Sequence, residues 1–256
     1  MSEWFTNDRF WQLLYPYMFD ADRLATTQQE VDGILALGAP AGRRVLDLCS
    51  GPGRHAVELA RRGYAVTGVD RSLFLMERAR ERAAAAGVAV EWVQADMREF
   101  ERPESFDLAI NMFSSIGYFE NDRENSRPLQ MLHRNLAPGG AALIELIAKE
   151  QLAKVLTNTS SAEYPDGSIL VQRHWVQDNW QRIRNQWILI RDETAQYFTF
   201  DHQLYSGVEL RDRLLAVGFR DVRLYGNLQG DAMGPQTTRL VAVATKQEQL
   251  AACPLP

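Results

Sequence analysis

The sequence predicts a doubly wound α/β fold in which a mostly parallel, seven-stranded sheet carries an inserted antiparallel sheet. Three observations indicate it. Short apolar segments alternate with segments of helical spacing over residues 41–148 and again over 203–247, as in a parallel sheet with helices on both faces. Residues 149–202 break this rhythm with consecutive extended segments. The length of 256 residues suffices for one large core, so we expect one domain with additions.

The first strand and the helix after it form the clearest unit. Residues 43–48 (RRVLDL) are a short apolar run that stops at the turn-forming sequence CSGPG, which predicts a buried strand that enters a tight loop. Apolar residues then recur at helical spacing up to Gly63, a natural helix stop, and residues 64–69 predict a second strand. This is a βαβ unit.

The same pattern continues along the chain. A helix is predicted over about 72–86 and strands over 88–93, 106–112 and 141–147. Pro128 lacks an N–H and would clash with the preceding turn inside a helix. We therefore expect the helix before the last of these strands to begin with Pro128 in its first turn and to end at the sequence PGG.

The insert contains extended segments over 169–177, 181–191 and 194–202. Short polar breaks separate these segments, a spacing typical of consecutive antiparallel hairpins. We therefore expect residues 149–202 to form an antiparallel sheet of their own.

Elements at both ends of the chain complete the predicted fold. Ser206 and Glu209 fit the capping box of a helix, and strands over 219–225 and 238–245 follow it. Residues 1–40 predict a helical cap over the strand ends, because their aromatic residues recur at partly helical spacing. These aromatic residues are Trp4, Phe5, Phe10, Trp11, Tyr15, Tyr17 and Phe19.

Composition and charge exclude several classes of function. A net charge of -5 and a pI near 5.5 argue against the large basic surface that nucleic acids require. No apolar run approaches the roughly 20 residues needed to cross a bilayer, and the N-terminus has no signal-peptide pattern. The two cysteines, Cys49 and Cys253, suit a reducing compartment. We therefore expect a cytoplasmic protein that binds neither nucleic acid nor a membrane.

A glycine-rich segment and two acids mark the ends of the first two strands. The segment GPGRHA, residues 51–56, fits G-x-G-x-x-A, and Asp70 follows Gly51 by 19 positions, close to the roughly 20 expected between a glycine loop and a ribose-binding acid. This pattern alone suits NAD equally well. Asp47 ends the first strand and would repel a pyrophosphate, whereas it would attract a cofactor that carries ammonium and sulfonium groups. The charge therefore favours S-adenosylmethionine over NAD.

The segments VLDLCSGPG, VTGVD and QADM together resemble the class I S-adenosylmethionine-dependent methyltransferase family. The order of predicted elements from about Arg43 to Lys246 is similar throughout. The resemblance implies a Rossmann-like fold with S-adenosylmethionine as the cofactor. It implies a cofactor site made of Asp47, Cys49, Gly51, Gly53, His55, Asp70, Arg71, Asp96, Met97, Asn111 and Phe113.

The resemblance also implies individual roles. The glycines would let the backbone approach the methionine part of the cofactor, while Asp47 would order its ammonium group. Asp70 would accept hydrogen bonds from both ribose hydroxyls, Asp96 would accept one from the adenine amine, and Met97 would cover the ring. Each residue also has a purely structural explanation, because acids and glycines are common in turns and at helix starts and because Met97 and Cys49 could simply fill the core.

The acceptor side carries weaker signals. The stretch NMFSSIGYF, residues 111–119, resembles a segment of small-molecule N-methyltransferases, including those that act on amino sugars. Asn111 lacks the Pro-Pro-aromatic sequence that family members use on adenine or glutamine nitrogen, so base methylation is not expected. The insert would be an acceptor-side lid or a dimer contact. Trp175 and Trp187 are expected to wall a pocket there, or to form the core of the insert itself.

The resemblance implies methyl transfer to a small-molecule acceptor at nitrogen or oxygen, with positioning as the main catalytic effect. We expect no metal site, and a monomer or homodimer. The catalytic candidates are Tyr15, Tyr118 and His133, with Glu145, His174 and His202 as further candidate bases. Three alternatives stay open: an NAD-dependent oxidoreductase, a protein that binds S-adenosylmethionine without turnover, and an enzyme of aminopropyl transfer.

Overall fold

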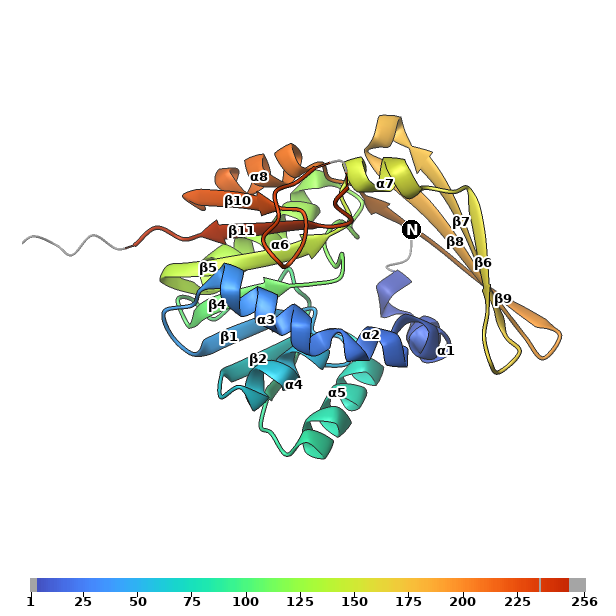
Figure 1. Cartoon of the computed structure of the whole chain (residues 1–256), viewed down its shortest axis with the longest axis horizontal. Coiled ribbons are helices and arrows are strands. Elements are labelled where there is room, and N and C mark those ends of the chain that lie inside the picture. Colours follow the sequence, from blue (N-terminus) through green and yellow to red (C-terminus); the bar gives the residue numbers. More distant parts are fainter. Residues whose placement is uncertain (1–3, 235, 249–256) are drawn as a thin grey trace, which may run out of the picture.

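Two β-sheets of different kinds dominate the computed structural model, which describes residues 4–234 and 236–248 (Figure 1). The larger sheet has seven strands with helices on both faces, and the smaller sheet has four antiparallel strands. The predicted doubly wound fold with an inserted antiparallel sheet is confirmed. Within the described residues, no helix is long and apolar enough to cross a membrane. Cys253 lies outside the described residues.

The larger sheet is assembled from segments that are far apart in the sequence. Its strands are β1 (Arg44–Leu48), β2 (Ala65–Asp70), β3 (Glu91–Gln94), β4 (Phe106–Asn111), β5 (Leu136–Leu146), β10 (Asp221–Tyr225) and β11 (Leu240–Thr245). Their order is β10-β11-β5-β4-β1-β2-β3, and β11 runs antiparallel to both of its neighbours. The chain reverses its direction of winding between β1 and β4. The carboxyl ends of these two strands therefore border the crevice where open α/β sheets bind ligands.

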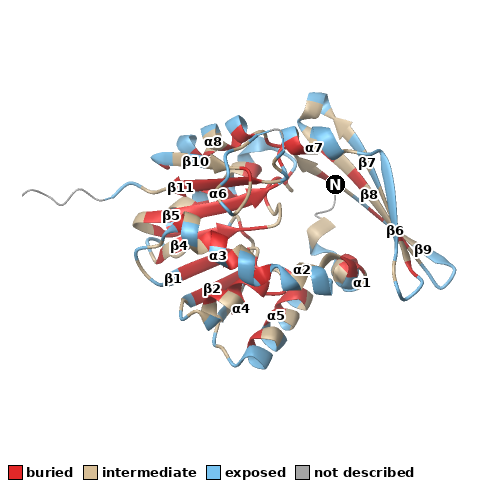
Figure 2. Cartoon of the chain, viewed as in Figure 1, coloured by how far each residue is buried: buried red, intermediate tan, exposed pale blue. Residues whose placement is uncertain are grey.

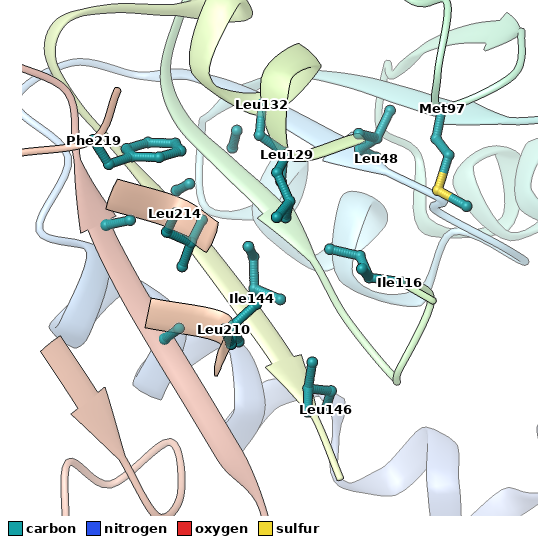
Figure 3. Packing of buried hydrophobic residues seen from close by; sticks show 14 of the residues in the cluster. Leu48, Met97, Ile116, Leu129, Leu132, Ile144, Leu146, Leu210, Leu214 and Phe219 are labelled. Atoms are coloured by element: carbon teal, nitrogen blue, oxygen red, sulfur yellow. The ribbon is translucent and has the colours of Figure 1, made fainter. Parts of the chain in front are cut away.

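Helices bury both faces of this sheet. Their bounds are α3 (Thr27–Gly38), α4 (Arg54–Arg61), α5 (Leu73–Ala86), α6 (Asp122–Asn135) and α8 (Gly207–Ala216). Apolar residues of α3 and α4 pack on one face, and those of α6 and α8 pack on the other. Figure 3 shows the second group, in which Leu129, Leu132, Leu210 and Leu214 lie near Ile144 of β5. Burial on both faces explains the continuous apolar runs of the central strands (Figure 2).

Helix caps agree with the predicted boundaries in most places. The side chain of Ser206 accepts a hydrogen bond from the Glu209 N–H, and Glu209 accepts one from the Ser206 N–H, so the predicted capping box is confirmed. At the start of α5, the side chain of Ser72 accepts a hydrogen bond from the Leu75 N–H. Gly87 ends that helix with a φ of +65°, a left-handed conformation that favours glycine.

Two predicted boundaries are wrong around α6. The helix does not begin at Pro128 but at Asp122, where Asn121 accepts a hydrogen bond of 2.9 Å from the Glu124 N–H. This cap and the acids of the first turn outweigh the single hydrogen bond that Pro128 removes. The PGG sequence does not separate the helix from the next strand either, because β5 already begins at Leu136. A shift of register between β4 and β5 accommodates this early start.

The N-terminal residues form η1 (Trp4–Thr6), α1 (Asp8–Met18) and α2 (Ala21–Ala25). In Figure 1, α1 lies between α5 and the smaller sheet. Its buried residues Phe10, Leu14 and Tyr17 pack against Leu170 and Phe198 of the insert. The N-terminal helix therefore joins the insert to the α/β core.

The insert contains more elements than predicted. It comprises α7 (Lys149–Val155), β6 (Thr159–Glu163), β7 (Ile169–Gln177), η2 (Asp178–Trp180), β8 (Arg182–Arg191) and β9 (Thr194–Gln203). The predicted strands correspond to β7, β8 and β9, whereas α7 and β6 were not predicted. The sequence of β6, TSSAE, is exposed at every position, so it lacks the apolar alternation by which a strand can be recognised.

Candidate functional site

A cavity of about 250 Å³ opens at the carboxyl ends of the central strands, near the lower end of the volumes typical of small-molecule sites. The loops that follow β1, β2 and β4 line one side of it. Trp4 and Phe10 of the N-terminal elements and Trp187 and Phe200 of the insert line another. Both additions to the α/β core thus take part in enclosing one site.

The cavity brings together most of the residues predicted for a cofactor. Those that line it are Cys49, Gly51, His55, Asp70, Arg71, Asp96, Met97 and Phe113. Three others, Asp47, Gly53 and Asn111, lie outside its lining. The first group comes from four separate segments of the sequence, so only the fold places these residues side by side.

Asp70 fixes the glycine-rich loop against the end of β2. Its Oδ2 accepts a hydrogen bond of 2.8 Å from the Gly51 N–H, and its Oδ1 accepts one of 2.9 Å from the Ser72 N–H. Burial raises the pKa of Asp70, although these backbone N–H groups oppose the shift. The carboxylate therefore holds the loop and the start of α5 in place, and it also lines the cavity.

Asp47 is a buried acid beneath this loop. Its side chain is 1% exposed, and its Oδ2 has no hydrogen-bond partner among the described residues. The pKa of Asp47 is raised to about 7, mainly by burial, with Arg54 opposing the shift and the charge of Asp70 adding to it. A cation bound above the loop would stabilise the ionised carboxylate, whereas a pyrophosphate would repel it.

Gly53 and Asn111 hold the surroundings of the site together. A Cβ on Gly53 would lie 2.6 Å from the Trp92 ring and 2.8 Å from the Ala79 Cβ, and its φ is +73°, so only glycine fits there. Asn111 is fully buried and donates a hydrogen bond of 2.8 Å to the Leu48 carbonyl. Gly53 thus lets the start of α4 lie close to α5 and to Trp92 of β3. Asn111 joins β4 to β1.

Asp96 is already paired on both of its oxygens. Its Oδ1 accepts hydrogen bonds from the backbone N–H and Nε of Arg98, and its Oδ2 accepts them from Arg98 Nη2 and Arg71 Nη1 at 2.7 and 2.8 Å. Burial alone would raise the pKa of Asp96, but hydrogen bonds and charge from Arg98, with Arg71, hold it below its ordinary value. A ligand amine could bind Asp96 only by sharing these bonds.

Met97, Cys49 and His55 contribute to the lining without free charge. The sulfur atoms of Met97 and Cys49 are 3.3 Å apart, and burial raises the pKa of the Cys49 thiol, which keeps it protonated. His55 is buried, and its Nε2 lies 2.8 Å from Glu30 Oε2. Burial lowers the pKa of His55 to about 4, so its imidazole is neutral at physiological pH.

Only two of the six candidate bases line the cavity, Tyr118 and His202. Burial raises the pKa of Tyr118 well above its ordinary value, so this phenol keeps its proton. His133 packs edge-on against Phe219 with ring centroids 5.0 Å apart, on the side covered by α6 and α8. That position does not fit a catalytic base. Tyr15 lies beyond the lining, with its hydroxyl 3.5 Å from Arg82 Nη2.

His202 belongs to a chain of polar groups across three strands of the insert. Asn185 Nδ2 lies 3.3 Å from His202 Nδ1, and Asn185 Oδ1 lies 2.8 Å from His174 Nδ1. Burial lowers the pKa of His202 to about 4. With the amide in this orientation, Nδ1 of His202 accepts a hydrogen bond and its Nε2 carries the proton.

The aromatic residues of the site pack as a continuous wall. The rings of Trp4 and Phe200 stack with centroids 4.5 Å apart, and Trp4 meets Tyr118 edge-on at 4.8 Å. Trp187 lines the cavity, whereas Trp175 points away on the opposite face of the insert and is 42% exposed. The expectation that both tryptophans form a wall is therefore wrong for Trp175.

The cavity is also lined by three residues that were not among the predicted site residues, Asn185, Phe200 and Phe119. A signal was present for the first two. In a strand, alternate residues share a face, so Asn185 lies on the face of Trp187 and Phe200 on that of His202. Once Trp187 and His202 are known to line the cavity, strand alternation predicts that Asn185 and Phe200 line it too.

Comparisons with known proteins agree with this geometry. A family model described as a methyltransferase domain matches residues 45–140. The 2-phytyl-1,4-naphtoquinone methyltransferase of Nostoc punctiforme is 41% identical over 114 residues, which are 41% of this chain and 47% of that protein. The chain spans about half the length of the curated relatives that it matches at 30% identity or more.

Solved structures extend the similarity to nearly the whole chain. The CcbJ methyltransferase of Streptomyces caelestis superposes with a TM-score of 0.74 at 19% identity, over 86% of this chain and 94% of that one. CalS10, an amino pentose methyltransferase of Micromonospora echinaspora solved with S-adenosylmethionine, gives 0.67 at 20% identity, over 93% and 97%. These likenesses confirm the fold.

The matched segment, residues 45–140, contains the glycine-rich loop and the three strand-end acids on which the resemblance was based. Residues 45–140 thus match a methyltransferase domain, and the fold over most of the chain is that of solved methyltransferases, in agreement with the resemblance to class I S-adenosylmethionine-dependent methyltransferases.

Proposed function

We propose that this protein transfers the methyl group of S-adenosylmethionine to a small-molecule acceptor, at a nitrogen or an oxygen atom. One observation carries the proposal: a single cavity joins the glycine-rich loop and Asp70 to an aromatic wall built by the N-terminal cap and the insert. The names of the quinone and amino pentose methyltransferases among its relatives describe small acceptors, which supports this class of substrate.

The residues on the strand ends fit the cofactor by charge and shape. Bound S-adenosylmethionine supplies an electrophilic methyl group on a sulfonium. Gly51 allows close approach of the backbone, and the unpartnered oxygen of Asp47 below the loop favours the ammonium end. Asp70 would accept hydrogen bonds from the ribose hydroxyls, and Met97 would cover the adenine ring. A dinucleotide fits less well, because its pyrophosphate would lie near the buried carboxyl of Asp47 at the end of β1.

Positioning is the main contribution that the remaining residues can make. The aromatic wall would hold the acceptor against the strand ends and exclude water, and alignment of this kind can supply roughly 7–11 kcal/mol of a barrier. Neither Tyr118 nor His202 is tuned to remove a proton at neutral pH, given the direction of their pKa shifts. His202 would instead donate a hydrogen bond from Nε2, and the acceptor would attack as a neutral amine or a hydroxyl of low pKa.

Replacement of Asp70 by alanine should separate cofactor binding from folding. The variant loses the acceptor for the ribose hydroxyls and the anchor of the Gly51 N–H, so we expect the affinity for S-adenosylhomocysteine to fall at least about tenfold. Isothermal titration measures it. Asp221→Ala is the matched control, because Asp221 pairs with Arg223 at the start of β10, outside the cavity. Equal affinity in Asp70→Ala and Asp221→Ala would contradict the assignment.

The affinity should also depend on pH through Asp47. Below its pKa of about 7 the free protein holds this carboxyl protonated, whereas a bound ammonium favours the ionised form. Binding should therefore release a proton near neutral pH, and the affinity should decline as pH falls below about 7. Titrations in buffers of different ionisation enthalpy measure the release. Asp47→Asn should remove it, and an unchanged pH profile in that variant would refute the role.

The acceptor wall is tested by a pair of tryptophan variants. Release of S-adenosylhomocysteine is measured with a panel of small amines and phenols, and any turnover at all supports methyl transfer. For the best substrate, Trp187→Ala should raise KM about tenfold or more, because a large contact surface is lost. Trp175→Ala, on the outer face of the same sheet, should leave KM unchanged. Equal effects of the two substitutions would show that the inner face does not bind the acceptor.

A further inference from the structure

Three polar side chains of the insert are connected by hydrogen bonds across neighbouring strands. They are His174 of β7, Asn185 of β8 and His202 of β9. The register places Asn185 directly opposite His174 on one side and opposite Phe200 on the other. Asn185 and His202 line the main cavity, whereas His174 lies outside its lining. The connected groups thus lead from the body of the insert to the wall of the site.

The orientation of the Asn185 amide is set by the backbone of β9. Asn185 Nδ2 lies 3.4 Å from the Phe200 carbonyl oxygen, which can only accept a hydrogen bond. The opposite orientation would bring two acceptor oxygens together, so the NH2 group faces β9. Asn185 Oδ1 consequently faces His174, and the His174 Nδ1 atom 2.8 Å away must carry a hydrogen.

This orientation determines which ring nitrogen of His202 carries a hydrogen. His202 Nδ1 lies 3.3 Å from Asn185 Nδ2, which is a donor, so His202 Nδ1 accepts the hydrogen bond. Burial lowers the pKa of His202 to about 4, with the charges of Arg182 and His174 adding to the shift and that of Asp201 opposing it. The ring is therefore neutral at physiological pH, and its single hydrogen lies on Nε2.

The insert offers the cavity a hydrogen-bond donor and no carboxylate. The described residues that it contributes to the lining are Asn185, Trp187, Phe200 and His202. Both ends of the Asn185 amide are engaged, and the indole nitrogen of Trp187 is fully buried. Within the described residues, Nδ1 is the only ring nitrogen of His202 that has a hydrogen bond. The N–H at Nε2 is thus left for a ligand.

His202 lies where the insert meets the loop that follows β4. Its imidazole meets the ring of Tyr118 edge-on, with centroids 6.3 Å apart, and Tyr118 also lines the cavity. The carboxyl end of β4 borders the crevice at which open α/β sheets bind ligands. A molecule that binds His202 therefore lies beside the strand ends, on the acceptor side of the cavity.

Methyl transfer restricts which atom of the acceptor can bind this donor. The attacking atom needs its lone pair for the sulfonium methyl, so a hydrogen bond to that lone pair would weaken it as a nucleophile. A protonated amine has no lone pair with which to accept. Hydroxyl, carbonyl and carboxylate oxygens accept readily. The partner of His202 is therefore an oxygen other than the attacking atom.

We propose that His202 is a specificity-determining residue, whose Nε2 donates to an oxygen that the acceptor carries apart from its methylated atom. The substrates are then amines or phenols with an additional hydroxyl, carbonyl or carboxylate group. Asn185 is a positioning residue, because its hydrogen bond to Nδ1 keeps the hydrogen of His202 on Nε2. The inference rests on the proposed function.

NMR of the protein labelled with 15N-histidine tests the positioning without a substrate. The chain has four histidines, and His202→Gln assigns the His202 signals by their loss. Above neutral pH, we expect the wild-type ring to carry its hydrogen on Nε2. In Asn185→Asp, the carboxylate accepts from both rings and should draw the His202 hydrogen to Nδ1. A hydrogen on Nδ1 in wild type, or an unchanged ring in Asn185→Asp, would refute the positioning.

Pairs of acceptors that differ by one oxygen test the specificity. Examples are 2-amino-1-phenylethanol with 2-phenylethylamine, and catechol with phenol. In wild type, we expect kcat/KM to be at least about tenfold higher for the member with the additional oxygen. His202→Phe and Asn185→Asp should remove this preference, whereas His202→Gln, which keeps an amide donor, should retain most of it.

The matched control is Gln186→Glu, because it places the same charge on the next residue of β8, whose side chain lies on the opposite face beside Arg173. It should match wild type in both experiments. Equal kcat/KM for both members of every pair in wild type would overturn the specificity. No turnover of any amine or phenol would instead count against the proposed function, and the NMR result would still decide whether Asn185 positions His202.

Discussion

The arrangement of the site depends on two carboxyl groups, Asp47 and Asp70, which lie at the ends of β1 and β2. Asp47 is buried and Asp70 is partly buried. Asp70 shares its oxygens between the Gly51 and Ser72 N–H groups, so it shapes the loop and starts α5 together. Asp47 lies beneath the same loop with one oxygen unpartnered among the described residues. A protein tolerates such charge where a bound cation can balance it, and the nearby protein cation, Arg54, is already committed to Glu30.

The acceptor side is constructed on a different principle. Its walls come from the N-terminal elements and from the insert, two segments that are far apart in the sequence. Helix α1 joins them, because Phe10 and Leu14 pack against apolar residues of the insert. Aromatic stacking between Trp4 and Phe200 closes this wall. Because the wall is nearly uncharged, its selectivity must come from shape and from a few hydrogen bonds, such as those of the His202 chain.

Much of the fold and of the cofactor half could be predicted from the sequence, because local signals coincide there with the tertiary structure. The strand before CSGPG, the acid that ends β2 and the Ser206 cap all lie where their neighbours in sequence place them. Asn185 and Phe200 carried only the signal of strand alternation with Trp187 and His202, because the face of the insert that meets the cavity depends on contacts between segments far apart in the sequence. His133 was misplaced for the same reason, because a lone histidine on a helix does not show which face its helix buries.

A parallel isothermal titration of the purified protein with S-adenosylhomocysteine and NAD tests which cofactor the strand ends bind. We expect micromolar binding of S-adenosylhomocysteine and no binding of NAD, because the carboxyl of Asp47 at the end of β1 suits an ammonium and opposes a pyrophosphate. Binding of NAD without S-adenosylhomocysteine would contradict this expectation.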